Sequence, residues 1–156
     1  MDVNEKIEWL EREIESLKKE VEKQDENSNV WKPELGETYY QLNGAGEVFS
    51  DSWENMECEK RMYSIGNVFE TKEDAEFTVE RLKVIQELKQ FARPFKPGES
   101  NYSINWKFSD GILFICVCRV VKGNELHFES EEKAREAIKA VGEERIMKYY
   151  LRVGEE

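Results

Sequence analysis

The amino-acid sequence predicts an α+β protein: an N-terminal coiled-coil helix, then a tandem ββ(β)α unit with an antiparallel sheet and helices on one face. Apolar residues near the N-terminus follow a strict heptad. Strand-like runs separated by glycine turns fill the rest of the chain, and two of them lead into capped helix starts. We therefore expect a coiled-coil helix over residues 1–26, a linker over 27–36 and an α+β domain over 37–156.

The first helix carries a narrow apolar seam. The spacing between its apolar residues alternates between four and three, which places β-branched residues at heptad position a and mostly leucine at d, a pattern that favours a parallel two-stranded coil. The predicted dimerisation residues are Val3, Ile7, Leu10, Ile14, Leu17 and Val21. A helix packed on its own body remains the alternative, although such a helix usually has a wider apolar stripe.

Charged residues beside the seam agree with a parallel homodimer. Across such an interface Lys6 meets Glu11 and Glu13 meets Lys18, and both pairs attract. The polar run at 24–29 marks the end of the coil. Because about three heptads are short for an isolated coil, we expect the body of the protein to contribute to the dimer.

The first half of the body reads as a hairpin followed by a helix. Residues 38–42 and 47–53 predict two strands joined by a glycine turn. The stretch 54–63 fits either a loop or a short helix, and 67–70 reads as a short strand. Thr71 is a good N-cap for a helix that ends before Arg93-Pro94, because the residue before proline avoids the α region.

The second half repeats this order. Residues 102–108 and 112–121 predict a hairpin, and the second strand is apolar enough to be central in the sheet. A third strand is expected over 125–129. Ser130 then caps a helix, and a last helix covers 143–150.

The two halves match at their strand-to-helix junctions. Residues 69–75 align with 128–134, each with a phenylalanine, a hydroxyl-bearing cap, acidic residues and an alanine in the same order. This match predicts a possible duplication of 37–92 in 100–141. The alternative is that both are generic strand-to-helix junctions.

Residue types that carry chemistry are sparse, so we expect no enzyme, no catalytic residue, no cofactor and no metal. His127 stands alone in a strand, where a half-exposed structural role is expected. Cys116 and Cys118 share one face of a strand, which we expect to be buried and apolar. A metal site would need a further Cys or His pair. Cys58 lies among acids, which disfavour its thiolate.

The chain is acidic, with a formal net charge of −11, and residues 31–78 hold 11 acids against 4 bases. This balance makes nucleic-acid binding unlikely. It fits either solubility alone or a surface that imitates the charge of nucleic acid. The possible partner-binding acidic face comprises Asp51, Glu54, Glu57, Glu59, Glu73, Asp74 and Glu76.

A basic stretch with interleaved aromatic residues follows. Basic and aromatic groups together can bind an anionic, stackable ligand such as a nucleotide. The possible anion- or nucleotide-binding residues are Lys89, Arg93, Lys96, Trp106 and Lys107. The alternative is that the bases compensate the dipole at a helix C-terminus and the aromatics fill the core.

Targeting signals are not evident. No apolar run approaches the roughly 18 residues that a membrane span needs, and no apolar stretch follows a basic start as in a signal peptide. The three cysteines are an odd number without a disulfide or metal spacing. We therefore expect a cytoplasmic protein with free thiols and no membrane partner.

Three stretches carry a resemblance to known proteins. They are Trp31-Lys32-Pro33 with Gly36-Glu37-Thr38-Tyr39-Tyr40 and Gly46-Glu47-Val48, then Ser64 to Glu76, then Val141-Gly142-Glu143-Glu144-Arg145-Ile146. Over about residues 31–150 the chain resembles small uncharacterised accessory proteins of bacteriophages and prophages, mostly from Firmicutes. The resemblance carries over no catalytic residue. It implies an accessory phage function in the infected bacterium, and that group includes inhibitors of host defences.

Three functions follow as hypotheses. The first is a non-enzymatic inhibitor that binds a bacterial anti-phage defence protein directly, as an anti-CRISPR does, by contact or by nucleic-acid mimicry. The second is a sponge that sequesters a cyclic nucleotide through the basic-aromatic stretch. The third is a dimeric DNA-binding or regulatory phage protein, which the net charge disfavours.

Overall fold

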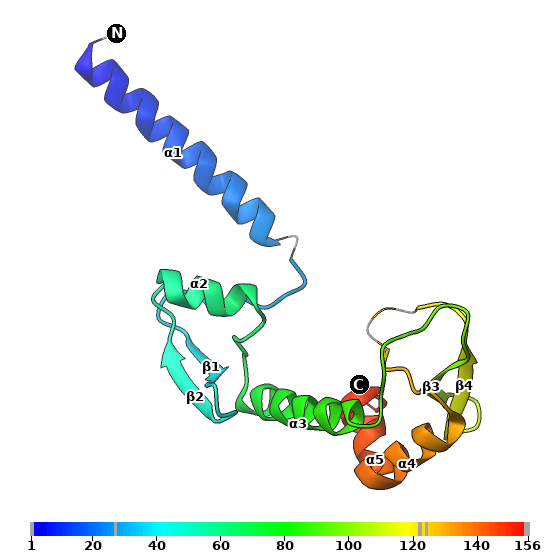
Figure 1. The fold of residues 1–156 in the computed structure, drawn as a ribbon. Helices are drawn as coiled ribbons and strands as arrows, with labels where there is room; N and C mark the ends of the chain where they lie inside the picture. Colours follow the sequence, from blue (N-terminus) through cyan, green and yellow to red (C-terminus); the bar gives the residue numbers. More distant parts are fainter. Residues whose placement is uncertain (1, 27, 122, 124, 155–156) are drawn as a thin grey trace.

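The computed structural model describes residues 2–26, 28–121, 123 and 125–154, and for residues 22–26 it describes the backbone alone. It confirms the α+β class, because helices accompany two small antiparallel sheets of two strands each. Figure 1 shows two lobes joined by a long helix, with a further helix projecting from one lobe.

No helix in the described part of the chain is both long and apolar enough to cross a membrane.

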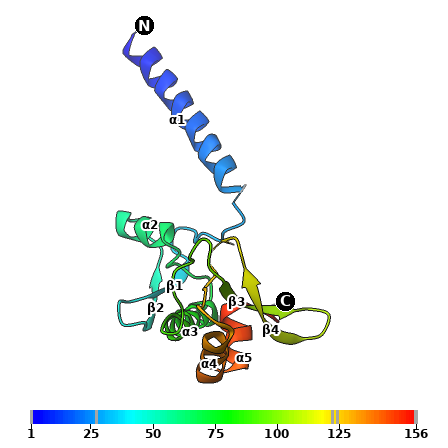
Figure 2. The ribbon, with the colours of Figure 1, turned by 45° about the vertical axis from the view of Figure 1, so that its right-hand side comes forward.

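Helix α1 (Val3–Glu26) projects away from the rest of the chain in both views (Figures 1 and 2). Its first turn closes with reciprocal bonds: the Glu5 N–H donates to Asp2 Oδ1 at 2.9 Å, and the Asp2 N–H donates to Glu5 Oε2 at 2.8 Å. This capping satisfies N–H groups that a helix start leaves free. The helix covers the predicted range, whereas its pairing with a second copy stays a prediction.

The N-terminal lobe, residues 31–71, is a hairpin with a short helix. Strands β1 (Thr38–Leu42) and β2 (Val48–Ser52) pair antiparallel, with Tyr40 opposite Ser50. Helix α2 (Glu57–Ser64) settles the stretch that the sequence left between loop and short helix.

Aromatic rings form the centre of this lobe. Trp53 is buried and stands edge-on to Tyr39 at 5.6 Å and to Tyr63 at 6.4 Å between ring centroids. Edge-to-face pairs of this kind stabilise beyond their burial by about 0.5–1.5 kcal/mol. Burial, assisted by the negative charge of Glu59, raises the pKa of Tyr39 to about 12, so the phenol stays neutral at physiological pH.

The predicted linker, 27–36, is partly docked on this lobe. Pro33 is buried and Trp31 is half-buried. The Gly36 N–H donates to the Trp53 carbonyl at 2.8 Å. The chain is therefore tied down about ten residues after α1 ends.

Helix α3 (Lys72–Lys89) joins the two lobes (Figure 1). Thr71 caps it as predicted, because the Thr71 hydroxyl oxygen accepts a bond from the Asp74 N–H at 3.1 Å. Ala75, near its start, is buried beside the N-terminal lobe, whereas Val84 and Leu88 belong to the core of the other lobe. One helix thus contributes to the packing of both lobes.

The C-terminal lobe, residues 93–154, holds the main core. Strands β3 (Asn101–Lys107) and β4 (Ile112–Cys118) form its hairpin, and α4 (Glu131–Val141) packs beside it. A short α5 (Glu143–Arg145) and a π-helical turn η1 (Ile146–Tyr150) follow where the sequence predicts a last helix. The core cluster is Val84, Leu88, Ile104, Phe128, Ala134, Ala137, Val141 and Ile146.

A bidentate ion pair joins Arg145 of α5 to Glu87 of α3. Arg145 Nη1 donates to Glu87 Oε2 at 2.8 Å, and Arg145 Nη2 donates to Glu87 Oε1 at 2.9 Å. The Arg145 hydrogen bonds lower the pKa of Glu87 below its usual value. The two parallel hydrogen bonds of this pair also fix the orientation of the guanidinium relative to the carboxylate.

The sequence predicted one antiparallel sheet, and this prediction is wrong about the extent of the sheet. Each lobe has its own two-stranded sheet within the described residues. The predicted short third strands are reduced to isolated antiparallel bridges: Tyr40 with Phe69 in the first lobe, and Tyr102 with Phe128 and Arg93 with His127 in the second. A segment that leads straight into a helix cap leaves little length for strand pairing.

Candidate functional site

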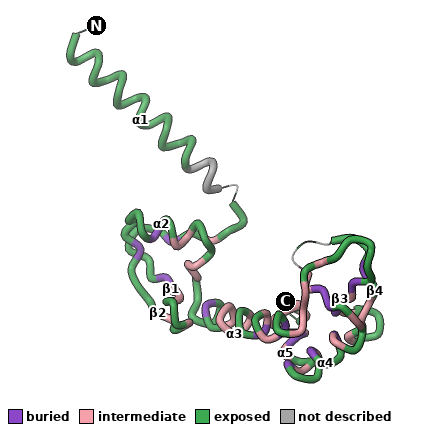
Figure 3. Tube along the Cα trace, in the orientation of Figure 1, coloured by how far each residue is buried: buried purple, intermediate pink, exposed green. Residues whose placement is uncertain are grey.

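The exposed face of α1 is the first candidate site. All six predicted seam residues, from Val3 to Val21, are exposed, with 45% to 75% of each residue accessible. Figure 3 shows α1 exposed along its described length, in contrast to the mixed burial of the lobes. A contiguous apolar stripe in water usually marks a protein-protein contact. Trp9 is exposed as well but lies outside the seam, at heptad position c.

The charges of α1 are divided between its two sides. Glu8 pairs with Arg12 at 3.4 Å and Glu15 with Lys19 at 4.0 Å. Both pairs join heptad positions b and f, on the side away from the seam. The residues predicted to pair across an interface are Lys6, Glu11, Glu13 and Lys18. In the described part of α1 none of these four makes an ion pair, so they stay available to a second helix.

Most of the predicted acidic face is exposed as expected. Its exposed members are Asp51, Glu54, Glu57, Glu73, Asp74 and Glu76. They lie in the N-terminal lobe and on the first turn of α3, so the acidic surface belongs to the lobe that follows α1. Two of them, Glu57 and Glu76, each pair with a basic residue four positions away.

The prediction that Glu59 belongs to this exposed face is wrong, because Glu59 is only 1% exposed. Its Oε2 accepts the Met56 N–H at 2.7 Å, and both of its oxygens accept the Glu54 N–H at 3.1 Å. The carboxylate therefore closes the start of α2 and fixes the preceding turn, in the position that a capping box gives to glutamate. Its role is structural, and it cannot contact a partner.

The predicted basic-aromatic residues do not form one surface. Arg93 is used internally: Nη1 donates to Asn101 Oδ1 at 2.9 Å, and Nη2 donates to the Ser100 carbonyl at 3.0 Å. Lys89 and Lys96 lie near this end of β3. Trp106 and Lys107 lie at the other end of the strand, where Lys107 bonds Asp110.

The separation follows from strand geometry. At about 3.3 Å per residue, the six steps from Asn101 to Lys107 span about 20 Å. A single nucleotide bound to one copy could therefore contact one end of the predicted site but not both.

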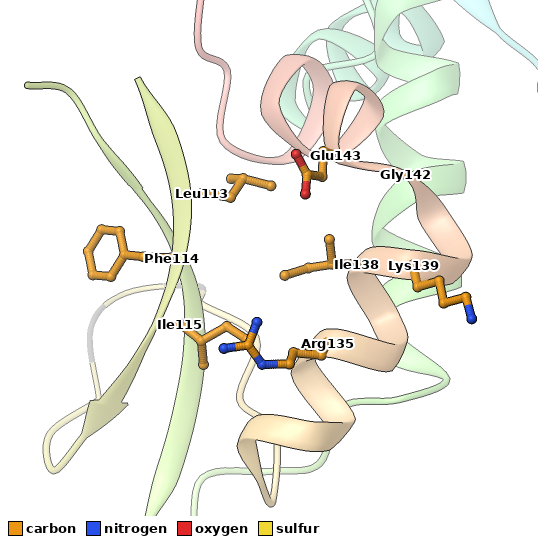
Figure 4. Close-up of a pocket in the computed structure, with 8 residues that line it drawn as sticks. All are labelled: Leu113, Phe114, Ile115, Arg135, Ile138, Lys139, Gly142 and Glu143. Atoms are coloured by element: carbon orange, nitrogen blue, oxygen red, sulfur yellow. The ribbon is translucent and has the colours of Figure 1, made fainter. Parts of the chain in front are cut away.

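Strand β4 is not central in a sheet, contrary to the prediction. It pairs with β3 along one edge only among the described strands. Figure 4 shows Leu113 and Ile115 on the side of α4 and Phe114 pointing away from it. Phe114 and Ile112 are exposed. The face that was expected to be buried and apolar is thus open at its Ile112 end.

The space between β4 and α4 is a groove of about 680 Å³ (Figure 4). Leu113 and Ile138 line it on facing sides, and Arg135 and Glu143 lie at its margin. Its lining holds the charged side chains of Arg135, Lys139 and Glu143 but no serine, threonine, cysteine or histidine. We therefore assign no chemistry to this groove.

The Cys118 end of the same face is polar and covered. Ser103 Oγ lies 2.9 Å from Cys118 Sγ and 3.3 Å from Cys116 Sγ. Asn105 Nδ2 donates to Cys116 Sγ at 3.0 Å. His127 is buried here, not half-exposed as predicted.

Sequence reasoning missed the grouping of Cys118, Glu125 and His127. The available signal was the alternation of strand side chains, which puts residues two apart on one face, as with Glu125 and His127 or Cys116 and Cys118. What the sequence did not provide was the pairing that sets these two segments side by side.

Comparison with protein-family models, with curated proteins and with solved structures finds no match to this chain.

Proposed function

We propose that the chain is a non-enzymatic binding protein that acts as a parallel homodimer, with α1 joining two copies and the body contacting a further partner. The exposed seam of α1 is the observation that supports this. A lone helix is marginal in water, because hydrogen bonding hardly offsets the entropy lost on ordering. Pairing two seams would supply the stabilisation that α1 lacks.

The energies of burial and association agree with a dimer of modest affinity. Each seam residue contributes about 1.5–3 kcal/mol when it is fully buried. Association costs about 4–15 kcal/mol in lost rigid-body freedom, so six partly buried residues per chain give a limited surplus. We therefore propose that the two bodies add contacts to the pair.

The partner that we propose is a basic surface on a bacterial anti-phage defence protein, reached in the cytoplasm of the infected cell. The exposed acids of the N-terminal lobe, including Asp51 and Glu54, support a basic partner because carboxylates can occupy sites built for phosphates. The sequence resemblance to phage accessory proteins supports the biological setting.

We also propose that the two lobes are two versions of one ββα unit. Each lobe has an antiparallel hairpin, and each has one bridge from its first strand to a phenylalanine, Tyr40 to Phe69 and Tyr102 to Phe128. Each phenylalanine lies two residues before a hydroxyl-bearing helix cap, Thr71 or Ser130. A duplicated unit is expected to keep its strand pairing even after the sequences of its two copies have diverged.

Removing residues 1–26 is expected to lower the solution mass from about twice 18.5 kDa to that of a single truncated chain at micromolar concentration. The body should stay folded, because none of the core residues that the structure describes comes from α1. Multi-angle light scattering measures the mass, and near-ultraviolet circular dichroism reports the packed aromatic residues. A full-length protein that is monomeric at every concentration would refute the homodimer.

Expressing the protein in a defended host is expected to restore plaque formation by a phage that the host otherwise blocks. Reversing two exposed acids, Asp51→Lys with Glu54→Lys, should reduce this rescue at least about tenfold, since like charges at an interface cost several kcal/mol. Glu143→Lys with Glu144→Lys makes the same charge change in the other lobe and should leave rescue intact. Absence of rescue by the wild-type protein across the host's defence systems would refute the inhibitor role.

A further inference from the structure

Three metal-binding side chains meet inside the C-terminal lobe. The candidate ligand atoms of Cys118, Glu125 and His127 all lie within 4.8 Å of one another. Cys118 is 5% exposed and His127 is 4% exposed, and Glu125 is half-buried. The three come from two segments that are separated in sequence.

Backbone pairing brings these segments together. Tyr102 of β3 pairs with Val117 of β4 on one edge and with Phe128 on the other. The segment that carries Glu125 and His127 therefore runs along the edge of β3 away from β4. Side chains alternate in an extended chain, so Glu125 and His127 project from the face opposite to buried Phe128. That face holds Ser103, whose hydroxyl contacts Cys118 Sγ.

Two atoms of this cluster have no hydrogen-bond partner. Glu125 Oε2 and His127 Nε2 are buried and unpaired within the part of the chain that the structure describes. Leaving one buried polar atom unpaired costs about 1–3 kcal/mol. Such atoms are uncommon in folded proteins and call for an explanation, for which an ion is one of the standard candidates. A single cation between them would satisfy both.

Nearby positive charge does not explain these atoms. Arg93 has an unpaired buried Nε as well, but its Nη atoms bond Asn101, Pro94 and Ser100. Its described ion pair is with Glu99, at 3.5 Å, and not with Glu125. The carboxylate of Glu125 is thus left without a cation among the described side chains.

The donor set selects the ion. Thiolate, imidazole and carboxylate together are a ligand set of Zn²⁺, whereas Mg²⁺ and Ca²⁺ take oxygen ligands alone. Three protein ligands leave a fourth tetrahedral position. A second thiol is close to this group, because Cys116 Sγ lies 3.8 Å from Cys118 Sγ. Two sulfurs at about 2.3 Å from a tetrahedral zinc ion lie about 3.8 Å apart.

A cavity lies beside two of the three proposed ligands. A cavity of about 400 Å³ is lined by Glu125 and His127 together with Phe95. The Phe95 ring stands edge-on to the imidazole at 5.2 Å and limits its rotation. Lys89 and Arg93 also line the cavity, so a cation binds against some positive charge. The negative charge that offsets this comes from Glu125 and from Cys118 once its thiol is deprotonated.

The Cys118 thiol has to lose its proton before zinc can bind to the sulfur. Burial raises the pKa of Cys118, and the neighbouring Cys116 and Glu125 raise it further against a lowering hydrogen bond from Ser103. Metal binding exchanges the thiol proton for a metal-sulfur bond and releases that proton to solvent. Affinity therefore falls as pH falls.

We propose that Cys118, Glu125 and His127 form a zinc-binding site that closes the C-terminal lobe by joining β4 to the segment before α4. The site is independent of the dimer seam and of the acidic face. Its role is structural. Within the described residues, β4 and the segment before α4 each pair with β3 and not with each other, so the ion links these two segments directly.

The test uses the full-length protein without a histidine tag, reduced and stripped of metal. Zn²⁺ should bind at one equivalent per chain and raise the melting temperature. Co²⁺ should give the visible bands of a tetrahedral ion and a thiolate-to-metal charge-transfer band. Cys118→Ser, Glu125→Gln and His127→Gln should each weaken binding at least about tenfold, as losing a ligand or its support does.

The matched control is Cys58→Ser, which removes an exposed thiol in the other lobe and should leave zinc binding unchanged. Circular dichroism of each metal-free variant identifies those that remain folded. Folded wild-type protein that binds no zinc overturns the proposal. Equal zinc binding by the wild-type protein and by folded Cys118→Ser and His127→Gln also overturns it, because the ion is then held elsewhere.

Discussion

The substitution Leu10→Asp is expected to dissociate the proposed homodimer into monomers. Leu10 lies at heptad position d in the middle of the seam, so pairing brings both new carboxylates into one apolar layer. Burying unpaired charges costs several kcal/mol, and about 3 kcal/mol corresponds to a roughly 100-fold weaker dimer. Sedimentation velocity over a range of concentrations measures the change in dissociation constant.

The control for this variant is Trp9→Asp. Trp9 is exposed to about the same degree as Leu10, at 51% against 45%, but it lies outside the seam. The same charge introduced one position earlier should leave the dimer mass unchanged. Equal effects of the two variants would show that α1 does not pair through the predicted seam.

The substitution Phe128→Ala is expected to lower the free energy of unfolding by about 3–5 kcal/mol, the usual range for a buried phenylalanine. Phe128 has no exposed surface and lies in the main core. Its backbone also exchanges two hydrogen bonds with Tyr102, at 2.8 and 3.0 Å. Domains of this size are stable by about 5–15 kcal/mol, so the loss is a large share of the total. Urea denaturation followed by circular dichroism measures it.

Phe108→Ala is the matched control. The same side chain is removed, but Phe108 is 93% exposed at the β3–β4 turn. We expect its free energy of unfolding to stay within about 0.5 kcal/mol of the wild-type value. A loss comparable to that of Phe128→Ala would contradict the placement of the two rings.

Local signals predicted the helices of the body well. Thr71 and Ser130 were expected to be N-caps from residue type and position, and both hydroxyl oxygens accept an N–H three residues on, at 3.1 Å. The hairpins were expected from strand-like runs around glycine turns, and both are present. These features depend on contacts within a few residues, which a sequence specifies directly.

Features that depend on distant neighbours could not be predicted in the same way. The apolar run of β4 resembles a central strand, but α4 covers only one of its faces, so Phe114 on the other face is exposed. Glu59 was counted among exposed acids because its charge is visible in the sequence, whereas the turn that buries it is not.

The zinc proposal shows the same limit. Cys118 and His127 were each considered alone, and each alone suggested no metal. Their proximity arises because Tyr102 pairs with β4 on one side and bridges to Phe128 on the other, which no spacing rule contains. Glu125 was overlooked because an acid in an acidic chain carries little signal.

The docked linker has a consequence for how a paired molecule would engage its target. Between Glu26, the last residue of α1, and buried Pro33 lie six residues, 27–32, and the seven residue steps of this connection span at most about 25 Å. Two N-terminal lobes on such short tethers would share a high effective concentration. A target with a single site would gain little from this, whereas one with two neighbouring sites would be held by avidity and released slowly.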